Sequence, residues 1–226
     1  MPKTVRNLLA TAPILLKGHM HTDSESKLFR LDINNIEDES VGLLNKPQID
    51  CIYIDLDGVL VDHYAQLAVN VGMHPLEFKN KLHNFQSKEE RENYVYPLII
   101  EGVGLDTFIK APPTPEFKEF CALINHWSNL NINVEILSSA MSENGLNQEI
   151  IRQKQIWLGT HGLQLLPQNF PLGSKVKQEY AKPKCVLIDD FERNIIQWKE
   201  KVPTAIGIHH TCMSTTRKEL KKYGLL

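Results

Sequence analysis

Two short apolar runs that lead into aspartates constrain the fold of this chain more than any other feature. The run at residues 52–54 leads into Asp-Leu-Asp-Gly at residues 55–58, and the run at residues 185–188 leads into Asp189 and Asp190. Apolar runs of this length, bounded by polar residues, predict buried strands. Ligands in open α/β sheets bind at the carboxyl ends of the strands. The aspartates therefore predict a functional site at that edge of a sheet.

The same aspartates predict a divalent cation. If the fold brings Asp55, Asp57, Asp189 and Asp190 together, the clustered carboxylates cannot all stay charged without a counter-ion. A hard cation with oxygen ligands meets this requirement, and magnesium is the usual one where phosphates are handled. We therefore expect these four aspartates to form the metal site and Mg²⁺ to be the cofactor.

The order of the predicted elements indicates an α/β domain with one helical insertion. Residues 1–48 form an N-terminal extension, and residues 49–61 hold the first strand and its acidic loop. Residues 62–113 have a helical pattern, whereas strands and helices alternate over residues 114–226. Strands separated by helices imply a doubly wound parallel sheet. We predict a core domain of residues 49–61 and 114–226, with a small helical cap at residues 62–113.

Periodicity and capping residues place the individual elements. Pro75 suits a first helical position and Ser87 suits an N-cap, while Thr114 is expected to cap a helix that has Pro115 at its first position. Besides the helix that Thr114 caps, we expect helices at residues 63–71, 75–85, 88–96, 146–158, 191–201 and 215–223, and strands at residues 132–137, 185–188 and 205–208.

Composition narrows the possible partners and compartments. The chain of 226 residues has a formal net charge of −2, so we expect no long nucleic acid, which would require a basic groove. We also expect no membrane partner, because no apolar segment has the length of a span. The four cysteines include no CxxC pair, which indicates reduced thiols and a cytoplasmic protein. A targeting sequence within residues 1–22 is the weaker interpretation, because Pro13 interrupts the apolar stretch.

Four parts with complementary chemistry occur in order along the chain. A carboxylate can attack phosphorus, and a second carboxylate can protonate the leaving oxygen. A glycine lets backbone N–H groups approach a phosphate, while a hydroxyl and an ammonium stabilise charge on its oxygens. The parts are Asp55-Leu56-Asp57-Gly58, then Ser138 after a strand, then a lysine, and then Asp189-Asp190 with Asn194 one turn later.

These motifs resemble those of the haloacid dehalogenase-like (HAD) phosphohydrolase superfamily. The resemblance covers roughly residues 50–210 and implies a Rossmann-like core. It implies that Asp55 is the nucleophile, that Asp57 is the general acid/base and that Ser138 binds the phosphoryl group. It also implies that Asp189 and Asp190 serve the magnesium site, together with the backbone carbonyl of Asp57.

The resemblance requires a lysine before the last motif strand, and the sequence offers four. Lys177 opens the segment Lys-Gln-Glu-Tyr-Ala, which looks like the lysine-led short helix of the family. We favour Lys177 as the catalytic lysine and rank Lys175 second. The other two candidates are Lys182 and Lys184.

The position of the insertion, between Asp57 and Ser138, resembles the cap-1 subgroup. The segment at residues 186–190, with Asn194 and Trp198 after it, resembles the 5′(3′)-deoxyribonucleotidase branch and its phage relatives. That branch implies cap aromatics that stack on a base. The candidate aromatics are Phe78, Phe85, Tyr94, Tyr96 and Phe108. We choose Phe85 and Tyr94 from these as substrate-binding residues. Gly58 and Ser139 are the other two residues that we expect to bind substrate.

The expected function is that of a magnesium-dependent phosphomonoesterase that forms an aspartyl-phosphate and acts on nucleoside monophosphates. Two alternatives keep the fold. One is a phosphatase for a polynucleotide 3′-phosphate or a phospho-sugar, and the other is a catalytically silent protein that binds a phosphorylated ligand. A signalling receiver domain is excluded, because its acidic pair precedes the phospho-accepting aspartate in sequence.

Overall fold

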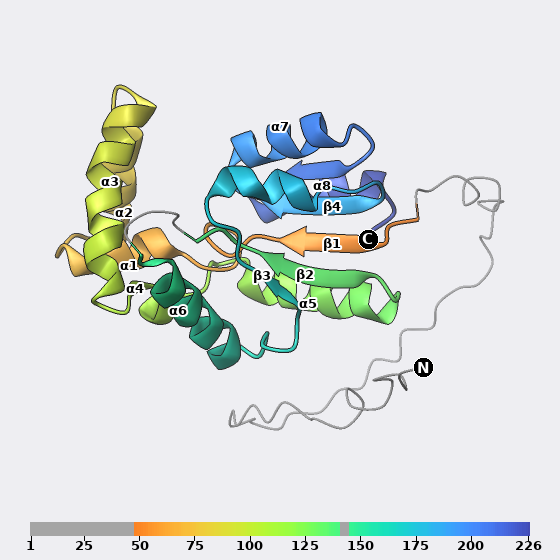
Figure 1. The fold of residues 1–226 in the computed structure, drawn as a ribbon, viewed down its shortest axis with the longest axis horizontal. Helices are drawn as coiled ribbons and strands as arrows, with labels where there is room; N and C mark the ends of the chain where they lie inside the picture. The colour runs from red at the N-terminus through yellow and green to blue at the C-terminus, as the bar shows by residue number, and fades with distance from the viewer. Residues whose placement is uncertain (1–47, 141–144) are drawn as a thin grey trace, which may run out of the picture. The chain divides into compact units, whose positions relative to one another are not determined.

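The computed structural model describes residues 48–140 and 145–226, so nearly all of the predicted N-terminal extension at residues 1–48 lies outside the described residues. The described residues form a five-stranded sheet in the order β3-β2-β1-β4-β5, and all its neighbouring strands are parallel (Figure 1). The strands are β1 (Cys51–Ile54), β2 (Asn133–Leu137), β3 (Gln168–Asn169), β4 (Cys185–Asp189) and β5 (Ile206–His209).

Helices cover both faces of this sheet. Successive strand residues point to opposite faces, and in β1 the residues on both faces are buried. In β1, Ile52 and Ile54 share a buried cluster with side chains of α5 (Phe117–Asn129) and α8 (Met213–Lys222). Cys51 and Tyr53 lie in a second cluster with side chains of α7 (Glu192–Lys201) and, partly buried, Tyr180 at the end of the 3₁₀ helix η3 (Ser174–Tyr180). This arrangement confirms the predicted doubly wound α/β sheet.

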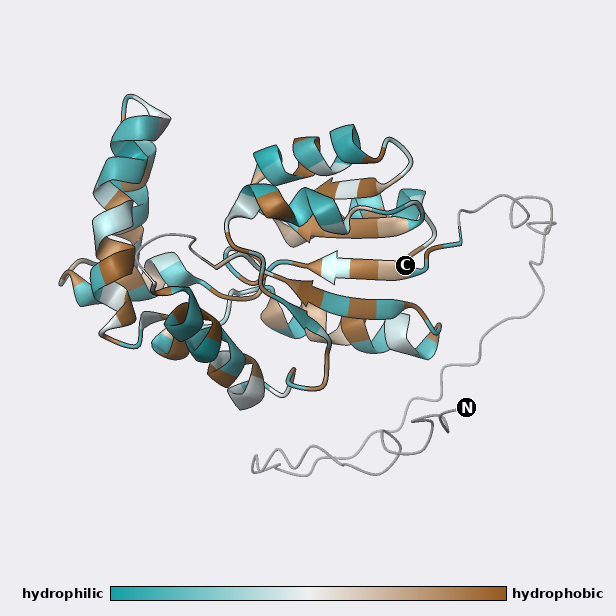
Figure 2. Ribbon diagram, viewed as in Figure 1, coloured by the Kyte–Doolittle hydropathy of each residue, from teal (hydrophilic) through white to brown (hydrophobic). Residues whose placement is uncertain are grey.

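Five of the described helices lie between β1 and β2 in the chain, and the first four of them lie beyond the carboxyl ends of the strands in Figure 1. These four are α1 (His63–Asn70), α2 (Pro75–His83), α3 (Lys88–Val103) and α4 (Thr107–Lys110). They have a small apolar cluster of their own, which includes Leu67, Phe78 and Val95. Figure 2 shows that the outer part of α3 is polar and that its part near α1 is apolar. We call these four helices the helical insert.

The segments that enter and leave the helical insert run side by side. The N–H of Asp62 donates to the carbonyl of Pro112, and the N–H of Thr114 donates to the carbonyl of Leu60, both at 2.9 Å. Helix α6 (Asn147–Thr160), which follows β2, also contacts the insert: the side-chain amide of Gln153 donates to the carbonyl of Val103 at 2.7 Å. The insert is therefore anchored to the sheet domain on two sides.

Several capping predictions are confirmed. The Ser87 hydroxyl accepts the N–H of Glu90 at the start of α3, and Pro75 is the first residue of α2. The predicted end of α3 at Tyr96 is wrong, because the helix continues through Pro97 to Val103. Its second half packs Ile99 against two apolar clusters, and this burial outweighs the hydrogen bond that Pro97 cannot donate.

The predicted role of Thr114 as a helix cap is also wrong. Helix α5 begins at Phe117, with Glu116 at the N-cap position. The Thr114 hydroxyl instead donates to the carbonyl of Val59 at 2.8 Å and thereby joins the two ends of the insert. The periodicity pattern missed α4 and β3, because elements of four and two residues are too short to show a period.

Within the part of the chain that the structure describes, none of the helices combines the length and the apolar character needed to cross a lipid bilayer.

Candidate active site

The strand register brings the motif residues to one edge of the sheet. Ile54 of β1 pairs with Ile136 of β2 and with Ile188 of β4, so that Asp55 and Asp189 both follow paired residues. Ser138 follows the end of β2 and is fully buried. Residues that are about 50 to 135 positions apart in sequence thus lie together at the carboxyl ends of parallel strands, as the sequence predicts.

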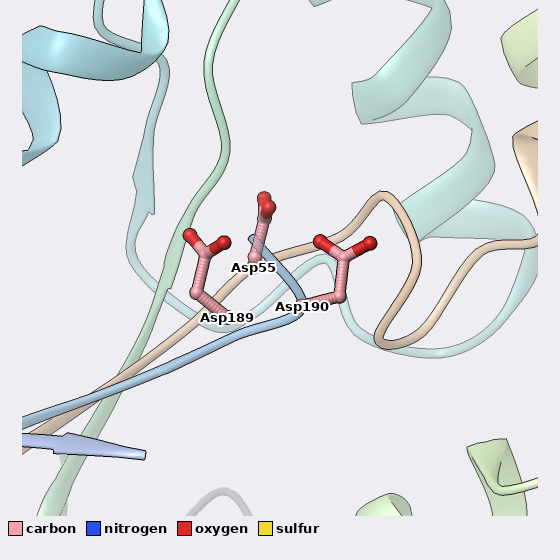
Figure 3. Close-up of side chains that lie close together, drawn as sticks. All are labelled: Asp55, Asp189 and Asp190. Carbon is pink, nitrogen blue, oxygen red and sulfur yellow. The ribbon is translucent and has the colours of Figure 1, made fainter. Parts of the chain in front are cut away.

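Three carboxylates form the centre of this site (Figure 3). Asp55 lies between Asp189 and Asp190, and the three side chains offer oxygen atoms that all lie within 4.8 Å of one another. Burial, together with the charges of Asp55 and Asp189, raises the pKa of Asp190 to about 8. A cluster of hard oxygen donors that resist being charged together fits a divalent cation such as Mg²⁺.

Lys177 bridges two of these carboxylates. Its Nζ atom lies 2.7 Å from Asp55 Oδ2 and 2.7 Å from Asp189 Oδ2, and the side chain is buried. Burial raises the pKa of Asp55 to about 6 despite the opposing effect of the Lys177 charge. Lys175, Lys182 and Lys184 are all exposed, so Lys177 is the candidate lysine that the fold brings to the acids.

Asp189 is held by several further donors. Its carboxylate accepts the N–H of Phe191 at 2.9 Å, and the side-chain amide of Asn194 reaches its oxygens at 3.0 and 2.9 Å. Asn194 lies on the first turn of α7, so the start of this helix positions the acid that ends β4. This contact explains why Asn194 follows Asp189 and Asp190 by about one helical turn in the sequence.

Gly58 lies directly against Asp190. Its φ angle is +77°, a left-handed conformation that favours glycine, and a Cβ atom at this position would lie 2.0 Å from Asp190 Oδ2. The glycine therefore makes room for the carboxylate as well as for the turn.

Gly58→Ala is expected to lower the free energy of unfolding by about 2–4 kcal/mol, because backbone strain adds to the clash with Asp190. Urea unfolding should be compared with that of Gly72→Ala. Gly72 has a similar φ of +68° but no atom within 4 Å of the added Cβ, so its loss should be about 1 kcal/mol. Equal losses in the two variants would show that the contact with Asp190 has no energetic consequence.

Asp57 points away from the acidic cluster and toward α6. Lys154 Nζ donates to Asp57 Oδ2 at 2.5 Å, to Ser138 Oγ at 3.0 Å and to the carbonyl of Ser139 at 2.9 Å. Burial acts to raise the pKa of Asp57, but the charges of Lys154 and His63 and the hydrogen bond from Lys154 together outweigh it, and the net shift is downward. The carboxylate of Asp57 therefore does not join the group of three oxygens, which leaves only its backbone carbonyl for the predicted metal role.

Sequence reasoning missed Lys154. It lies on a helix that the sequence predicts, where a lysine is normally solvated, but its side chain is buried. One signal was present: Lys154 follows Ile150 by four positions and precedes Trp157 by three, so it falls on the apolar side of the helix. A lysine in such a stripe requires a buried partner.

A pocket of about 280 Å³ opens beside Asp57. The helical insert contributes His63, Tyr96, Ile99 and Phe108 to its wall, and the sheet domain contributes residues that include Ser139 and Lys154. Burial lowers the pKa of His63, although the charge of Asp57 opposes the shift. The pocket thus lies between the helical insert and the sheet domain, next to Asp57, the candidate general acid/base.

Of the four predicted substrate-binding residues, Ser139 lines this pocket, whereas Gly58, Phe85 and Tyr94 do not. Phe85 and Tyr94 pack on each other inside the insert, with ring centroids 5.4 Å apart, and Tyr94 also packs near Phe78. Among the aromatic candidates, Tyr96 and Phe108 line the pocket. The periodicity of the helices did not distinguish these positions, because it does not define how the insert packs on the sheet domain.

Neither a family model nor a curated protein matches the sequence. Among solved structures, the chain is similar to a hydrolase from Streptococcus pneumoniae TIGR4, with 11% identity and a TM-score of 0.49 over 77% of this chain and 99% of that one. It is similar to a putative phosphatase from Clostridium difficile, with 14% identity and a TM-score of 0.46 over 79% and 99%. It is also similar to L-2-haloacid dehalogenase from Xanthobacter autotrophicus, with 8% identity and a TM-score of 0.41 over 79% of this chain and 84% of that one.

Proposed function

We propose that the chain is a magnesium-dependent phosphomonoesterase of the HAD type that acts on nucleoside monophosphates. The observation that carries this proposal is that two aspartates only two residues apart, Asp55 and Asp57, have different surroundings. Asp55 lies in the acidic cluster beside the buried ammonium of Lys177, whereas Asp57 faces the pocket. A nucleophile beside a phosphate-binding centre and an acid/base beside a leaving-group pocket are what hydrolysis through a covalent intermediate requires.

In the first half of the reaction, a carboxylate oxygen of Asp55 attacks phosphorus while the bond to the leaving oxygen breaks. The negative charge of the bound phosphate opposes the effect of Lys154 on Asp57, so that Asp57 carries a proton at Oδ1 and gives it to that oxygen. In the second half, Asp57 takes a proton from water, whose oxygen attacks the aspartyl-phosphate and releases inorganic phosphate from Asp55. Ser138 and Lys177 stabilise charge on the phosphoryl oxygens.

Asp55, Asp189, Asp190 and the backbone carbonyl of Asp57 would hold Mg²⁺, which supplies charge neutralisation between the nucleophile and the phosphate when it is bound. The fit rests on the three clustered carboxylates and on the raised pKa of Asp190.

The helical insert, at residues 62–113, would act as a cap of the cap-1 type. The pocket between the insert and the sheet domain would receive the nucleoside. Tyr96 and Phe108 replace Phe85 and Tyr94 as the proposed base-contacting aromatics, because they line the pocket. A volume of about 280 Å³ suits a small leaving group rather than a polynucleotide. All four cysteines are free thiols, which supports a cytoplasmic location.

The test is phosphate release from ribo- and deoxyribonucleoside monophosphates, sugar phosphates and a 3′-phosphorylated oligonucleotide, each with Mg²⁺ and with chelator. We expect magnesium-dependent release that is highest for a nucleoside monophosphate and that Asp55→Asn abolishes. Turnover that survives in Asp55→Asn would exclude the covalent mechanism. Binding of a nucleotide without any release of phosphate would favour a silent binding protein.

A further inference from the structure

Two buried polar atoms in the pocket wall have no hydrogen-bond partner among the described residues. They are Oδ1 of Asp57 and Nδ1 of His63. Buried polar atoms are nearly always paired, so an unpaired one needs an explanation such as a catalytic role or a bound molecule. Here two such atoms face each other, which points to one common explanation.

The two atoms are 3.8 Å apart. This distance is too long for a direct hydrogen bond, but a single oxygen atom can lie within hydrogen-bonding distance, about 2.8 Å, of both. Such an oxygen would donate its proton to Oδ1 or receive a proton from it, and it would accept the N–H of the imidazole. The pair is thus complementary to a hydroxyl group or a water molecule.

Both side chains are held in these positions by other contacts. The second oxygen of Asp57 is bound by Lys154 at 2.5 Å, so that Oδ1 is the oxygen left for the pocket. His63 is the first residue of α1, and its ring packs against Tyr64 in a tilted arrangement and stacks near Phe108, with centroid distances of 4.0 and 6.5 Å. The exposed fraction of His63 is 9%, so the ring cannot turn toward solvent without losing this packing.

We propose that His63 is a further catalytic residue, which binds the reacting oxygen together with Asp57. This inference rests on the proposed function. In the first half of the reaction, Nδ1–H of His63 donates to the leaving oxygen while Asp57 protonates it. In the second half, the same N–H donates to the attacking water while Asp57 Oδ1 takes its proton. His63 keeps its own proton throughout and stabilises the charge that develops on the oxygen.

Three variants separate this role from ring packing. His63→Phe keeps an aromatic ring between Tyr64 and Phe108 but removes the donor, and we expect kcat to fall about 10²-fold, as for the loss of one donor to a developing oxyanion. His63→Asn carries an amide nitrogen near the position of Nδ1 and should recover most of kcat. Tyr64→Phe changes the neighbouring ring without touching the pair and should leave kcat unchanged.

A second readout does not depend on turnover. Orthovanadate resembles a phosphoryl group in transit between two oxygens, so its apical oxygen should reach the pair. We expect it to shift the ¹⁵N resonance of His63 Nδ1 when added with Mg²⁺, and not in Asp57→Asn.

The outcomes distinguish the two proposals. Wild-type turnover with no loss in His63→Phe, or with equal losses in the Phe and Asn variants, would overturn the role of His63 and leave the phosphatase intact. Vanadate binding that leaves Nδ1 unshifted would do the same. A wild-type protein that neither releases phosphate nor binds vanadate would overturn the proposed function and, with it, the role of His63.

Discussion

Lys177→Met is expected to lower the free energy of unfolding by about 3–5 kcal/mol at pH 8 and to abolish phosphate release. The methionine fills the same space but leaves Asp55 and Asp189 without the ammonium that lies 2.7 Å from each. Removing one partner of a buried ion pair is costly, because the remaining charge stays buried without compensation. Urea unfolding in chelator measures the loss without interference from a bound cation.

The loss in Lys177→Met should shrink as the pH falls from 8 to 5. Burial already raises the pKa of Asp55 to about 6, and loss of the Lys177 charge raises it further above the value in the unfolded chain. The folded variant then binds a proton that the unfolded chain does not, so its stability increases as the pH falls, by up to about 1.4 kcal/mol per pH unit for each such carboxyl. A pH-independent loss would contradict this account.

Lys175→Met is the matched control, because it makes the same chemical change on the same 3₁₀ helix at an exposed site. It should unfold within about 0.5 kcal/mol of the wild type and retain turnover. If Lys175→Met were the inactive variant and Lys177→Met the active one, the assignment of the catalytic lysine would be reversed.

Asp57→Asn is expected to lower kcat by about 10²–10⁴-fold for an alkyl phosphate, the range for the loss of a general acid/base. The loss should be smaller for formation of the phosphoenzyme from p-nitrophenyl phosphate, because nitrophenolate leaves without a proton. Hydrolysis of the intermediate still needs the base, so a phosphorylated Asp55 should accumulate in this variant. Rapid-quench measurements followed by mass spectrometry would detect it.

Asp62→Asn provides the control for this change. Asp62 caps α1, with Oδ1 accepting the N–H of Ala65 at 3.0 Å, and asparagine is an equally good capping residue. We expect its kcat to remain close to the wild-type value. Equal losses in Asp57→Asn for alkyl and nitrophenyl substrates, with no accumulated intermediate, would remove Asp57 from the role of general acid/base.

The sequence predicts the sheet and its acidic edge well, because both depend on local patterns. Apolar runs of three and four residues define β1 and β4, and the aspartates directly after them must lie at the carboxyl ends of parallel strands. Lys177 was one of four candidates, since four lysines before β4 have similar local surroundings. Burial of one of them distinguishes it, and burial is a property of the folded chain.

The residues around Asp57 depend on contacts that only the tertiary structure contains. Lys154 and Asp57 are separated by 97 positions, and the helical insert places His63, Tyr96 and Phe108 around the pocket. By itself, the sequence determined which chemical groups stand at the strand ends, because a short apolar strand and the residue after it are adjacent in the chain. The tertiary structure alone decided that the ammonium of Lys154 binds Asp57 and that Tyr96 and Phe108 line the pocket, because these contacts depend on how α6 and the insert pack against the sheet domain.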